Sequence, residues 1–244
     1  MRTTRIHLDL PLAAGMEMVL PAAAARHLVR VLRLRAGAGI EVFNGDGCQY
    51  PAEIIEAGPR QDCRIRLGQA QRPEVESSLA VTLAQAVGRG ERMDWCIQKC
   101  TELGVARIQP LLTERTEVRL DARRAARRQA HWQQVAVAAA EQSRRVRVPV
   151  VDPPIPVQDL QAGPGLNLVL HPAGSHHPAD LAAPAQSAAS IVIGPEGGLS
   201  DGEIDRLERR GYQGLGLGAR ILRTETAGPA VLALLQTRFG DWSR

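Results

Sequence analysis

Three glycines and a glutamate follow a short apolar run in the last quarter of the chain. The run Ile191 to Ile193 leads into the turn Gly194-Pro195-Glu196-Gly197-Gly198. In open α/β sheets ligands bind beyond the carboxyl ends of strands, and glycines there let the backbone approach a ligand closely. The turn lacks the lysine of a phosphate loop and the GxGxxG spacing of a dinucleotide site. A glutamate would repel a phosphate but tolerates a cationic sulfonium. The turn predicts a site for such a ligand, although a plain tight turn explains the glycines equally well.

A second glycine-rich turn follows about twenty residues later, in the stretch Leu215-Gly216-Leu217-Gly218-Ala219-Arg220-Ile221-Leu222-Arg223-Thr224-Glu225-Thr226-Ala227. A short strand enters it and a helix leaves it. Thr224 or Thr226 can cap that helix, and Glu225 suits its positive end. Capping does not explain Arg220 and Arg223, which stand three residues apart beside the turn. These two arginines are therefore candidates for binding a negatively charged group.

The first seventy residues contain short alternating runs separated by Gly and Asp turns. Arg5 to Leu10 alternates as a half-buried strand does, and further strands are expected at 39–43, 52–55 and 63–67. Residues 22–34 are the exception, a helical stretch with Leu28, Val31 and Leu32 expected on one side. Short strands at this spacing predict a small β-barrel.

The pattern changes after Gln71 to Ser78, a polar stretch with Pro73 that has no periodicity. We therefore expect two domains, residues 1–72 and residues 73–244. In the second, strands alternate with helices, which predicts a parallel α/β sheet. Ser200 and Glu203 form the sequence pattern of a capping box. The expected strands are 79–84, 105–112, 166–170, 191–193 and 215–217, and the expected helices are 91–103, 123–143, 201–210 and 226–237.

Basic charge is concentrated in one part of the chain. The formal net charge is +4 and the isoelectric point about 9.2, which suits a polyanionic partner without requiring one. Residues 119–149 carry eight arginines against Asp121 and Glu141, a local balance of +6. A solvated helix face is the usual reason for such a run. However, arginines that recur at helical spacing repel one another, which favours a surface that tracks phosphates. Because Lys99 is the single lysine, the number of arginines alone is not evidence.

The cysteines and the apolar runs exclude several classes of protein. Cys48, Cys63, Cys96 and Cys100 form no CxxC pair, and no histidine stands at zinc-finger spacing. We expect no metal site and no disulfide, as in a reducing compartment. No apolar run reaches the length of a membrane span, and the N-terminus lacks a signal-peptide core. A cytoplasmic protein without a membrane partner is expected.

The two glycine-rich turns, GPEGG and LGxRxLRxETA, resemble the ribosomal RNA small subunit methyltransferase E family, which is of the SPOUT class. The resemblance extends along nearly the whole chain. It includes the N-terminal stretch 26–33 (RHLVRVLR), the stretches 89–94 (RGERMD), 97–99 (IQK) and 102–104 (ELG), and the central stretch 138–143 (AAAEQS). One departure is Gly228-Pro229 near the start of the last helix. Proline is tolerated in a first turn, so we expect a local adjustment.

The resemblance implies an N-terminal PUA-like β-barrel and a C-terminal SPOUT α/β domain with a deep trefoil knot. It also implies a homodimer that uses S-adenosyl-L-methionine to methylate N3 of a uridine in 16S rRNA of the small ribosomal subunit. RNA contacts are expected from Arg2, Arg5, Arg30 and Arg33, because of their charge and position. The cofactor residues carried over by position are Leu170, His171, Pro172, Gly194, Pro195, Glu196, Gly197, Gly198, Leu215, Leu217, Gly218, Ile221, Leu222 and Thr226.

The implied reaction sets the requirements for catalytic residues. Transfer of a methyl group from a sulfonium is an in-line displacement, so nucleophile and methyl carbon must be close and collinear. N3 of uracil carries a proton, so the site must stabilise the imide anion, supply a base, or both. Arg223 is the first candidate for stabilising the anion or gripping the target phosphate, and Arg220 is the alternative. Glu225 is a candidate base, although a helix cap or an arginine partner is the favoured role.

Two other functions are compatible with the pattern. One is a methyltransferase of the same class acting on transfer RNA or on a ribose hydroxyl, which the N-terminal match disfavours. The other is an RNA-binding ribosome-assembly factor that keeps the fold without catalysis. The intact GPEGG and RxLRxETA stretches argue against that second alternative.

Overall fold

The computed structural model describes residues 3–58 and 63–243. The chain forms two compact units. The first comprises Met1–Val75 together with Ala140–Arg147, and the second comprises Glu76–Ala139 and Val148–Arg244. Residues 140–147 thus pack with the first unit although they follow a long stretch of the second, which no local pattern in the sequence indicates. In the part of the chain that is described, no helix has both the length and the apolar character needed to cross a membrane.

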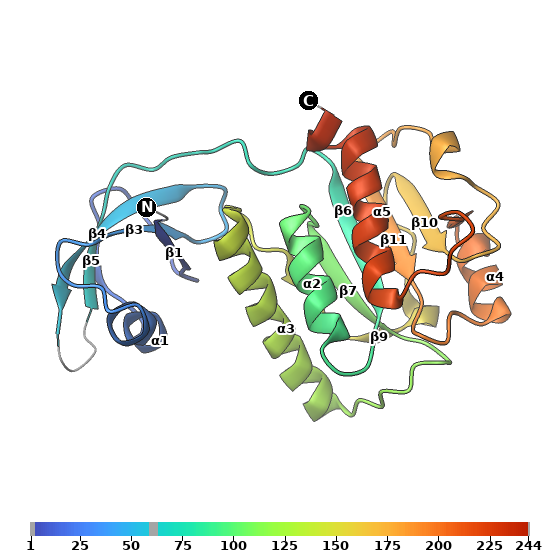
Figure 1. Ribbon diagram of the computed structural model, residues 1–244, viewed down its shortest axis with the longest axis horizontal. Coiled ribbons are helices and arrows are strands. Elements are labelled where there is room, and N and C mark those ends of the chain that lie inside the picture. The colour runs from blue at the N-terminus through green and yellow to red at the C-terminus, as the bar shows by residue number, and fades with distance from the viewer. Residues whose placement is uncertain (1–2, 59–62, 244) are drawn as a thin grey trace. The chain divides into compact units, whose positions relative to one another are not determined.

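The first unit is built on a five-stranded sheet (Figure 1). Its strand order is β1-β3-β4-β5-β2; β1 runs parallel to β3, and the other pairs are antiparallel. Alternate residues of the strands, such as Cys63, Ile65 and Leu67, are buried on one face and form the core of the unit. The strands are β1 (Thr4–His7), β2 (Glu17–Val19), β3 (Gly39–Phe43), β4 (Gln49–Ala57) and β5 (Cys63–Leu67).

The helical stretch of the first unit differs from its expected pattern. Helix α1 (Ala22–Arg26) continues into a π-helical turn, His27–Val31, in which the Leu32 amide donates to the carbonyl of His27. Leu28 is fully buried, but Val31 and Leu32 are 64% and 40% exposed. The three side chains, which we expected on one side, are therefore not buried together. The wider i→i+5 turn changes the angular spacing on which the prediction relied.

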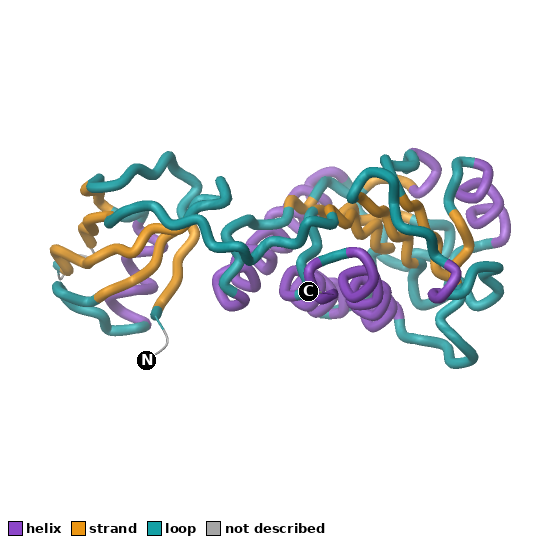
Figure 2. Tube along the Cα trace, turned by 90° about the horizontal axis from the view of Figure 1, so that it is seen from above, coloured by secondary structure: helices purple, strands orange, loops and turns teal. Residues whose placement is uncertain are grey.

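The second unit is a parallel α/β sheet, as the alternation of strands and helices predicted. Its strand order is β12-β10-β11-β6-β7-β8, with β9 also paired to β7, and every pairing is parallel. Figure 2 shows helices on both sides of these strands. The strands are β6 (Ala80–Ala86), β7 (Arg107–Leu112), β8 (Val150–Val151), β9 (Ile155–Pro156), β10 (Leu166–Leu170), β11 (Ala188–Ile193) and β12 (Gln213–Leu215).

Successive residues of the central strands point into two different cores. Leu83, Leu168 and Ile191 pack beneath one set of helices, whereas their neighbours Ala84, Val169 and Val192 face the other side. Burial on both faces explains why these strands are continuous apolar runs rather than alternating ones. The first face is covered by α2 (Arg92–Glu102), α3 (Ala122–Ser143) and α5 (Thr224–Phe239), and the second by α4 (Asp201–Arg209) and the 3₁₀ turn Val157–Asp159.

The ends of the helices test two local predictions. Ser200 and Glu203 form the predicted capping box of α4, with the Ser200 amide donating to Glu203 Oε2 at 2.9 Å. Helix α5 begins at Thr224, so Pro229 lies in its second turn rather than its first. Gly228 is buried, and a Cβ there would lie 3.4 Å from Cys96, Gln85 and Leu83. A Cβ at this position would thus be in ordinary van der Waals contact with α2 and the sheet, so the packing does not require glycine.

Arg5 lies in the interior of the first unit and not on its surface. Its Nε atom is 2.5 Å from Glu41 Oε1, its Nη2 atom donates to the carbonyl of Arg145 at 3.1 Å, and its guanidinium lies over the Phe43 ring. The side chain is 4% exposed. We therefore correct the expectation that Arg5 contacts RNA, because a buried and paired guanidinium cannot reach a phosphate.

Replacing Arg5 should destabilise the first unit strongly. Arg5→Met removes the nearer partner of the buried Glu41 carboxylate and leaves only the more exposed Arg144, 3.9 Å away. We expect the free energy of unfolding to fall by about 3 kcal/mol. Urea denaturation would measure the loss. The double variant R5M/E41M should recover most of it, because two apolar side chains replace the pair. Arg66→Met, which breaks an exposed pair with Glu17, is the control. A loss for R5M no larger than that for R66M would contradict the interpretation.

Candidate functional site

The three predicted ligand loops follow three neighbouring strands of the second unit. Leu170 at the end of β10 pairs with Ile193 at the end of β11 and with Leu215 at the end of β12. Because the strands are parallel, their carboxyl ends meet at one edge of the sheet. The segments that begin at His171, Gly194 and Gly216 therefore leave the sheet side by side, although up to 45 residues separate them in the sequence.

The loop after β10 packs directly on the end of β12. The His171 amide donates to the carbonyl of Leu215 at 3.2 Å, and the Gly216 amide donates to that of His176 at 3.0 Å. A Cβ on Gly174 would collide with the backbone of Leu215, so only glycine fits at this crossing. The His171 ring points toward α4, with Nε2 buried and 3.9 Å from Glu208 Oε1. The backbone of this loop is thereby fixed beside the second glycine-rich turn.

The GPEGG turn is closed by its own backbone and held from outside by Arg115. The Gly198 amide donates to the carbonyl of Pro195 at 2.9 Å, and Gly198 has φ 71°, a conformation that favours glycine. Arg115, in the loop after β7, donates through Nη1 to the carbonyls of Gly197 and Leu199 at 3.0 and 3.2 Å. The conformation of the turn is therefore fixed by hydrogen bonds within the chain.

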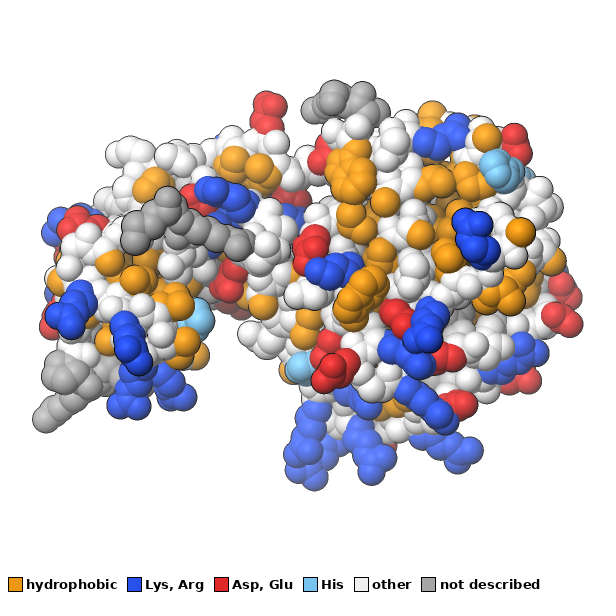
Figure 3. Space-filling model, in the orientation of Figure 1, with side chains coloured by type: hydrophobic (Ala, Val, Ile, Leu, Met, Phe, Trp, Pro, Cys, Tyr) orange, Lys and Arg blue, Asp and Glu red, His pale blue; other side chains and the backbone are white. Residues whose placement is uncertain are grey.

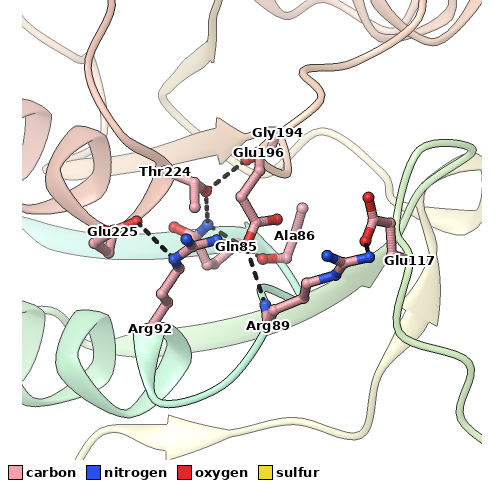
Figure 4. Close-up of polar contacts among 9 residues, drawn as sticks. All are labelled: Gln85, Ala86, Arg89, Arg92, Glu117, Gly194, Glu196, Thr224 and Glu225. Carbon is pink, nitrogen blue, oxygen red and sulfur yellow. Dashed lines mark hydrogen bonds and ion pairs between the residues drawn. The ribbon is translucent and has the colours of Figure 1, made fainter.

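Thr224 joins the two glycine-rich turns (Figure 4). Its hydroxyl donates to the Gly194 carbonyl at 2.7 Å and accepts from Gln85 Nε2 at 2.8 Å. Gln85 lies near the end of β6 and is buried. The prediction that Thr224 or Thr226 caps α5 was wrong, because Arg223 occupies the N-cap position and no side chain caps the helix. The Thr224 hydroxyl instead connects β6, the GPEGG turn and α5.

Arg92 at the start of α2 lies between two carboxylates (Figure 4). Its Nη1 atom forms an ion pair with Glu196 of the GPEGG turn, and its Nε atom is 3.9 Å from Glu225 Oε2. The Arg89 amide also donates to Glu196 Oε1, at 3.1 Å. Burial alone would raise the pKa of Glu196, but the backbone amides and Arg92 outweigh it and lower that pKa. Glu196 thus anchors its turn to α2.

Arg220 and Arg223 are both exposed, and neither guanidinium has a partner in the described chain. Arg223 immediately precedes α5, and its carbonyl accepts from the Thr226 and Ala227 amides. Ile221 is 86% exposed, whereas Leu217 and Leu222 pack against the core. The loop therefore holds its leucines inward and leaves both arginines and Ile221 exposed to solvent.

A groove of about 870 Å³ adjoins these elements. Of the predicted site residues, Glu225 and Thr226 contribute to its wall. Glu225 Oε2 is buried, lies 3.9 Å from Arg92 Nε and accepts no hydrogen bond from the described residues. The volume lies in the range of small-molecule and cofactor sites. The groove is lined by Arg89, Gly90, Glu91, Arg92, Asp94, Trp95, Gln98, Val135, Glu225 and Thr226.

Sequence reasoning missed Gln85, Arg89 and Arg92 as members of the site. The stretch 89–94 belongs to the family resemblance and overlaps the helix expected at 91–103, but the number of arginines in the chain gives no reason to single out Arg89 or Arg92. The signal that identifies Arg92 is spatial, since its partners stand 104 and 133 residues further along the chain. Among the predicted RNA contacts, Arg30 and Arg33 are exposed on the first unit, and Arg2 lies outside the described residues. The described residues contain no group of three side chains that could hold a metal ion.

Comparison with known proteins assigns both units to a class. Residues 75–236 match the RNA methyltransferase domain family, and residues 20–67 match the RNA methyltransferase PUA domain. The molecule is thus of the RNA methyltransferase class, with a PUA-like domain and a mixed α/β methyltransferase domain. The ribosomal RNA small subunit methyltransferase E of a Synechocystis strain is 36% identical over 88% of this chain and 71% of its own. The chain belongs to the ribosomal RNA small subunit methyltransferase E family.

Two solved structures resemble the whole chain. One is a ribosomal RNA small subunit methyltransferase E from Neisseria gonorrhoeae bound to S-adenosyl methionine, with a TM-score of 0.92 and 35% identity. The other, from Legionella pneumophila, is described as a proposed methyltransferase in complex with SAM, with a TM-score of 0.94 and 36% identity. Each similarity covers 99% of this chain and 100% of the other.

Removing the Thr224 hydroxyl should loosen the connection between the two turns. Thr224→Val preserves the shape but leaves the buried Gln85 amide and the Gly194 carbonyl without this partner. We expect the free energy of unfolding of the second unit to fall by about 1–3 kcal/mol, measured by urea denaturation. Thr224→Ser should restore most of the loss. Thr226→Val, at an exposed position two residues further on, is the matched control. Equal effects of T224V and T226V would refute the connecting role.

The ion pair of Glu196 predicts a dependence of stability on pH. Because folding lowers the pKa of Glu196, its contribution is complete above the ordinary value of 4.5 and is lost as the pH falls through the lowered pKa. The difference in thermal midpoint between wild type and Glu196→Gln should therefore shrink on acidification below that value. Repeating the comparison in an Arg92→Gln background should give a weaker pH dependence. A difference that is constant with pH would exclude this role of the charge.

Proposed function

We propose that the protein transfers the methyl group of S-adenosyl-L-methionine to N3 of a uridine in 16S rRNA of the small ribosomal subunit. The observation that carries this proposal is the match, over nearly all of both chains, to a ribosomal RNA small subunit methyltransferase E bound to S-adenosyl methionine. The arrangement of the second unit supports it, since three glycine-containing loops meet at the carboxyl edge of one sheet.

The residues present suit a sulfonium cofactor. Glu225 Oε2 is a buried oxygen without a hydrogen-bond donor in the described chain, and Glu196 adds a second carboxylate nearby. Together with Arg92 they leave the local charge negative by one, which tolerates a cation. Backbone groups of Leu170–Pro172, Gly194–Gly198 and Leu215–Thr226 would hold the cofactor, which supplies an electrophilic methyl group when bound. The roles of these residues are part of the proposal.

The chain's own residues must prepare the uracil for attack. The N3 proton has to leave, and a guanidinium beside the ring would stabilise the resulting imide anion. Arg223 suits this role because its side chain is exposed and unpaired at the start of α5, next to the groove residues Glu225 and Thr226. Arg220 is the alternative. Glu225 lies 3.9 Å from Arg92, which favours its role as an arginine partner over that of a base.

The proposal includes finer features of the family. We place RNA contacts of the first unit at Arg30 and Arg33, and a closed PUA-like barrel around its five-stranded sheet. We further propose a deep trefoil knot in the α/β domain, a homodimer and a cytoplasmic location. The domains would be residues 1–72 and 73–244, with residues 140–147 packed on the first.

Nucleoside analysis would test the proposed reaction directly. Small ribosomal subunits from cells lacking this protein would be incubated with it and the cofactor, and the digested 16S rRNA analysed by mass spectrometry. We expect one equivalent of N3-methyluridine per subunit, at one position. Methylation of transfer RNA or of a ribose hydroxyl instead would overturn the substrate assignment. Cofactor binding without any methylation would indicate a non-catalytic assembly factor.

Arg223→Ala should separate catalysis from cofactor binding. Loss of a group that stabilises the anion lowers turnover by about 10²–10³-fold, whereas cofactor affinity measured by calorimetry should stay nearly unchanged. Methyl incorporation into 16S rRNA would measure the turnover. Arg206→Ala, an exposed arginine on α4, is the control and should retain full activity. Unchanged turnover of R223A would remove Arg223 from the mechanism.

A further inference from the structure

One row of side chains on α3 runs away from the groove. Arg123, Arg127, His131 and Val135 stand four residues apart and so form one ridge, which winds by about 120° around the helix from Arg123 to Val135. Val135 lines the groove, and His131 Nε2 is 2.6 Å from Oδ2 of Asp94, another groove residue. At the helical rise, the row extends about 18 Å from Val135 to Arg123. The wall of the groove therefore continues along α3 toward its N-terminus.

The far end of this row is strongly basic. Residues 119–128 carry five arginines against Asp121, a balance of +4 that equals the net charge of the whole chain. Arg119, Arg123 and Arg127 are exposed and have no carboxylate partner among the described residues. Figure 3 shows arginine side chains gathered along one edge of the second unit. The other arginines of the sequence run, at positions 144, 145 and 147, belong to the first unit.

This placement is unfavourable for the isolated protein. Asp121 precedes α3 and its Oδ1 accepts from the Arg124 amide at 2.8 Å, but the first turn itself contains no acidic residue. Arg123 and Arg127 stand near the positive end of the helix without a carboxylate partner and repel each other at i,i+4 spacing. Helix α4 has the favourable arrangement, with Asp201 and Glu203 in its first turn and Arg206 and Arg209 in its last. The charges of α3 thus lower stability where they stand, and an anionic ligand would offset the cost.

We propose that the RNA strand next to the target nucleotide lies along α3, with its phosphates on Arg123 and Arg127 and with Arg119 and Arg124 at the far end. The assignment rests on the proposed function, because it takes RNA as the polyanion. It adds a second RNA-binding surface, on the methyltransferase domain itself. The row connects this surface to the groove beside Glu225 and Thr226, so phosphates held there would fix how far the strand enters the site.

Charge reversal on matched helices would test the assignment. R123E/R127E and the control R206E/R209E change the net charge equally, and both pairs are exposed. Binding of wild type and variants to a 16S rRNA fragment would be measured over a range of salt concentrations. For R123E/R127E we expect affinity for the RNA fragment to fall by about tenfold or more at low salt. The plot of log affinity against log salt should become shallower, with the magnitude of its slope reduced by roughly two. The thermal midpoint should rise, because the helix gains acidic residues in its first turns.

Further measurements distinguish RNA binding along α3 from a general effect of net charge and from contact between copies of the chain. R123Q/R127Q, which only neutralises the row, should also reduce the salt slope. R206E/R209E should keep the wild-type salt slope. If it loses as much affinity and slope as R123E/R127E, the effect is one of net charge and the assignment is overturned. A wild-type slope in R123E/R127E would also overturn it. A changed molecular mass of R123E/R127E in sedimentation would assign the surface to contact between copies. If wild type methylates 16S rRNA while R123E/R127E binds it equally well, the RNA path along α3 is wrong and the proposed function stands.

Discussion

The site depends on the buried hydroxyl of Thr224. Parallel pairing of β10, β11 and β12 brings three loops to one edge, but it does not fix the start of α5 against the GPEGG turn. The Thr224 hydroxyl does so, because it donates to the Gly194 carbonyl and accepts from the Gln85 amide. Each partner is fixed by its own element, Gln85 by β6 and Gly194 by β11. One short side chain therefore sets the spacing of two segments that are thirty residues apart.

The ion pairs of Arg92 form a second connection between the GPEGG turn and the start of α5. Arg92 extends from α2 between Glu196 and Glu225, so the turn after β11 and the first turn of α5 face the same guanidinium. The lowered pKa of Glu196 reflects how firmly this arrangement holds the carboxylate in its charged form. Arg220 and Arg223 have no such partners and stay exposed. Arg92 and Arg115 thus support the loops, whereas Arg220 and Arg223 are available for a ligand.

Local sequence patterns predicted the features that local physics decides. The capping box of α4, the glycine turns and the parallel sheet follow from short-range sterics, hydrogen bonding and apolar periodicity, and the structure contains them. Features that depend on distant partners were not predictable. Arg5 resembled a surface cation, but Glu41 on the neighbouring strand and the carbonyl of Arg145 hold it in the interior. Val31 and Leu32 are exposed although Leu28 is buried, because the π-helical turn changes the angular spacing assumed for that stretch.

The run of arginines between residues 119 and 149 also shows that the sequence alone does not reveal distant packing partners. From 119 to 149 it was one basic stretch, yet its members from 144 onward pack with the first unit, and Arg145 is buried there. What remains on α3 is a compact row at the positive end of a helix, whereas α4 of the same domain follows the favourable order of charges. The arginine-rich composition of the chain applies to α3 and α4 alike, so it does not explain why the order of acidic and basic residues differs between them. A requirement to bind an anion does, because the same charges that destabilise α3 alone would stabilise its complex.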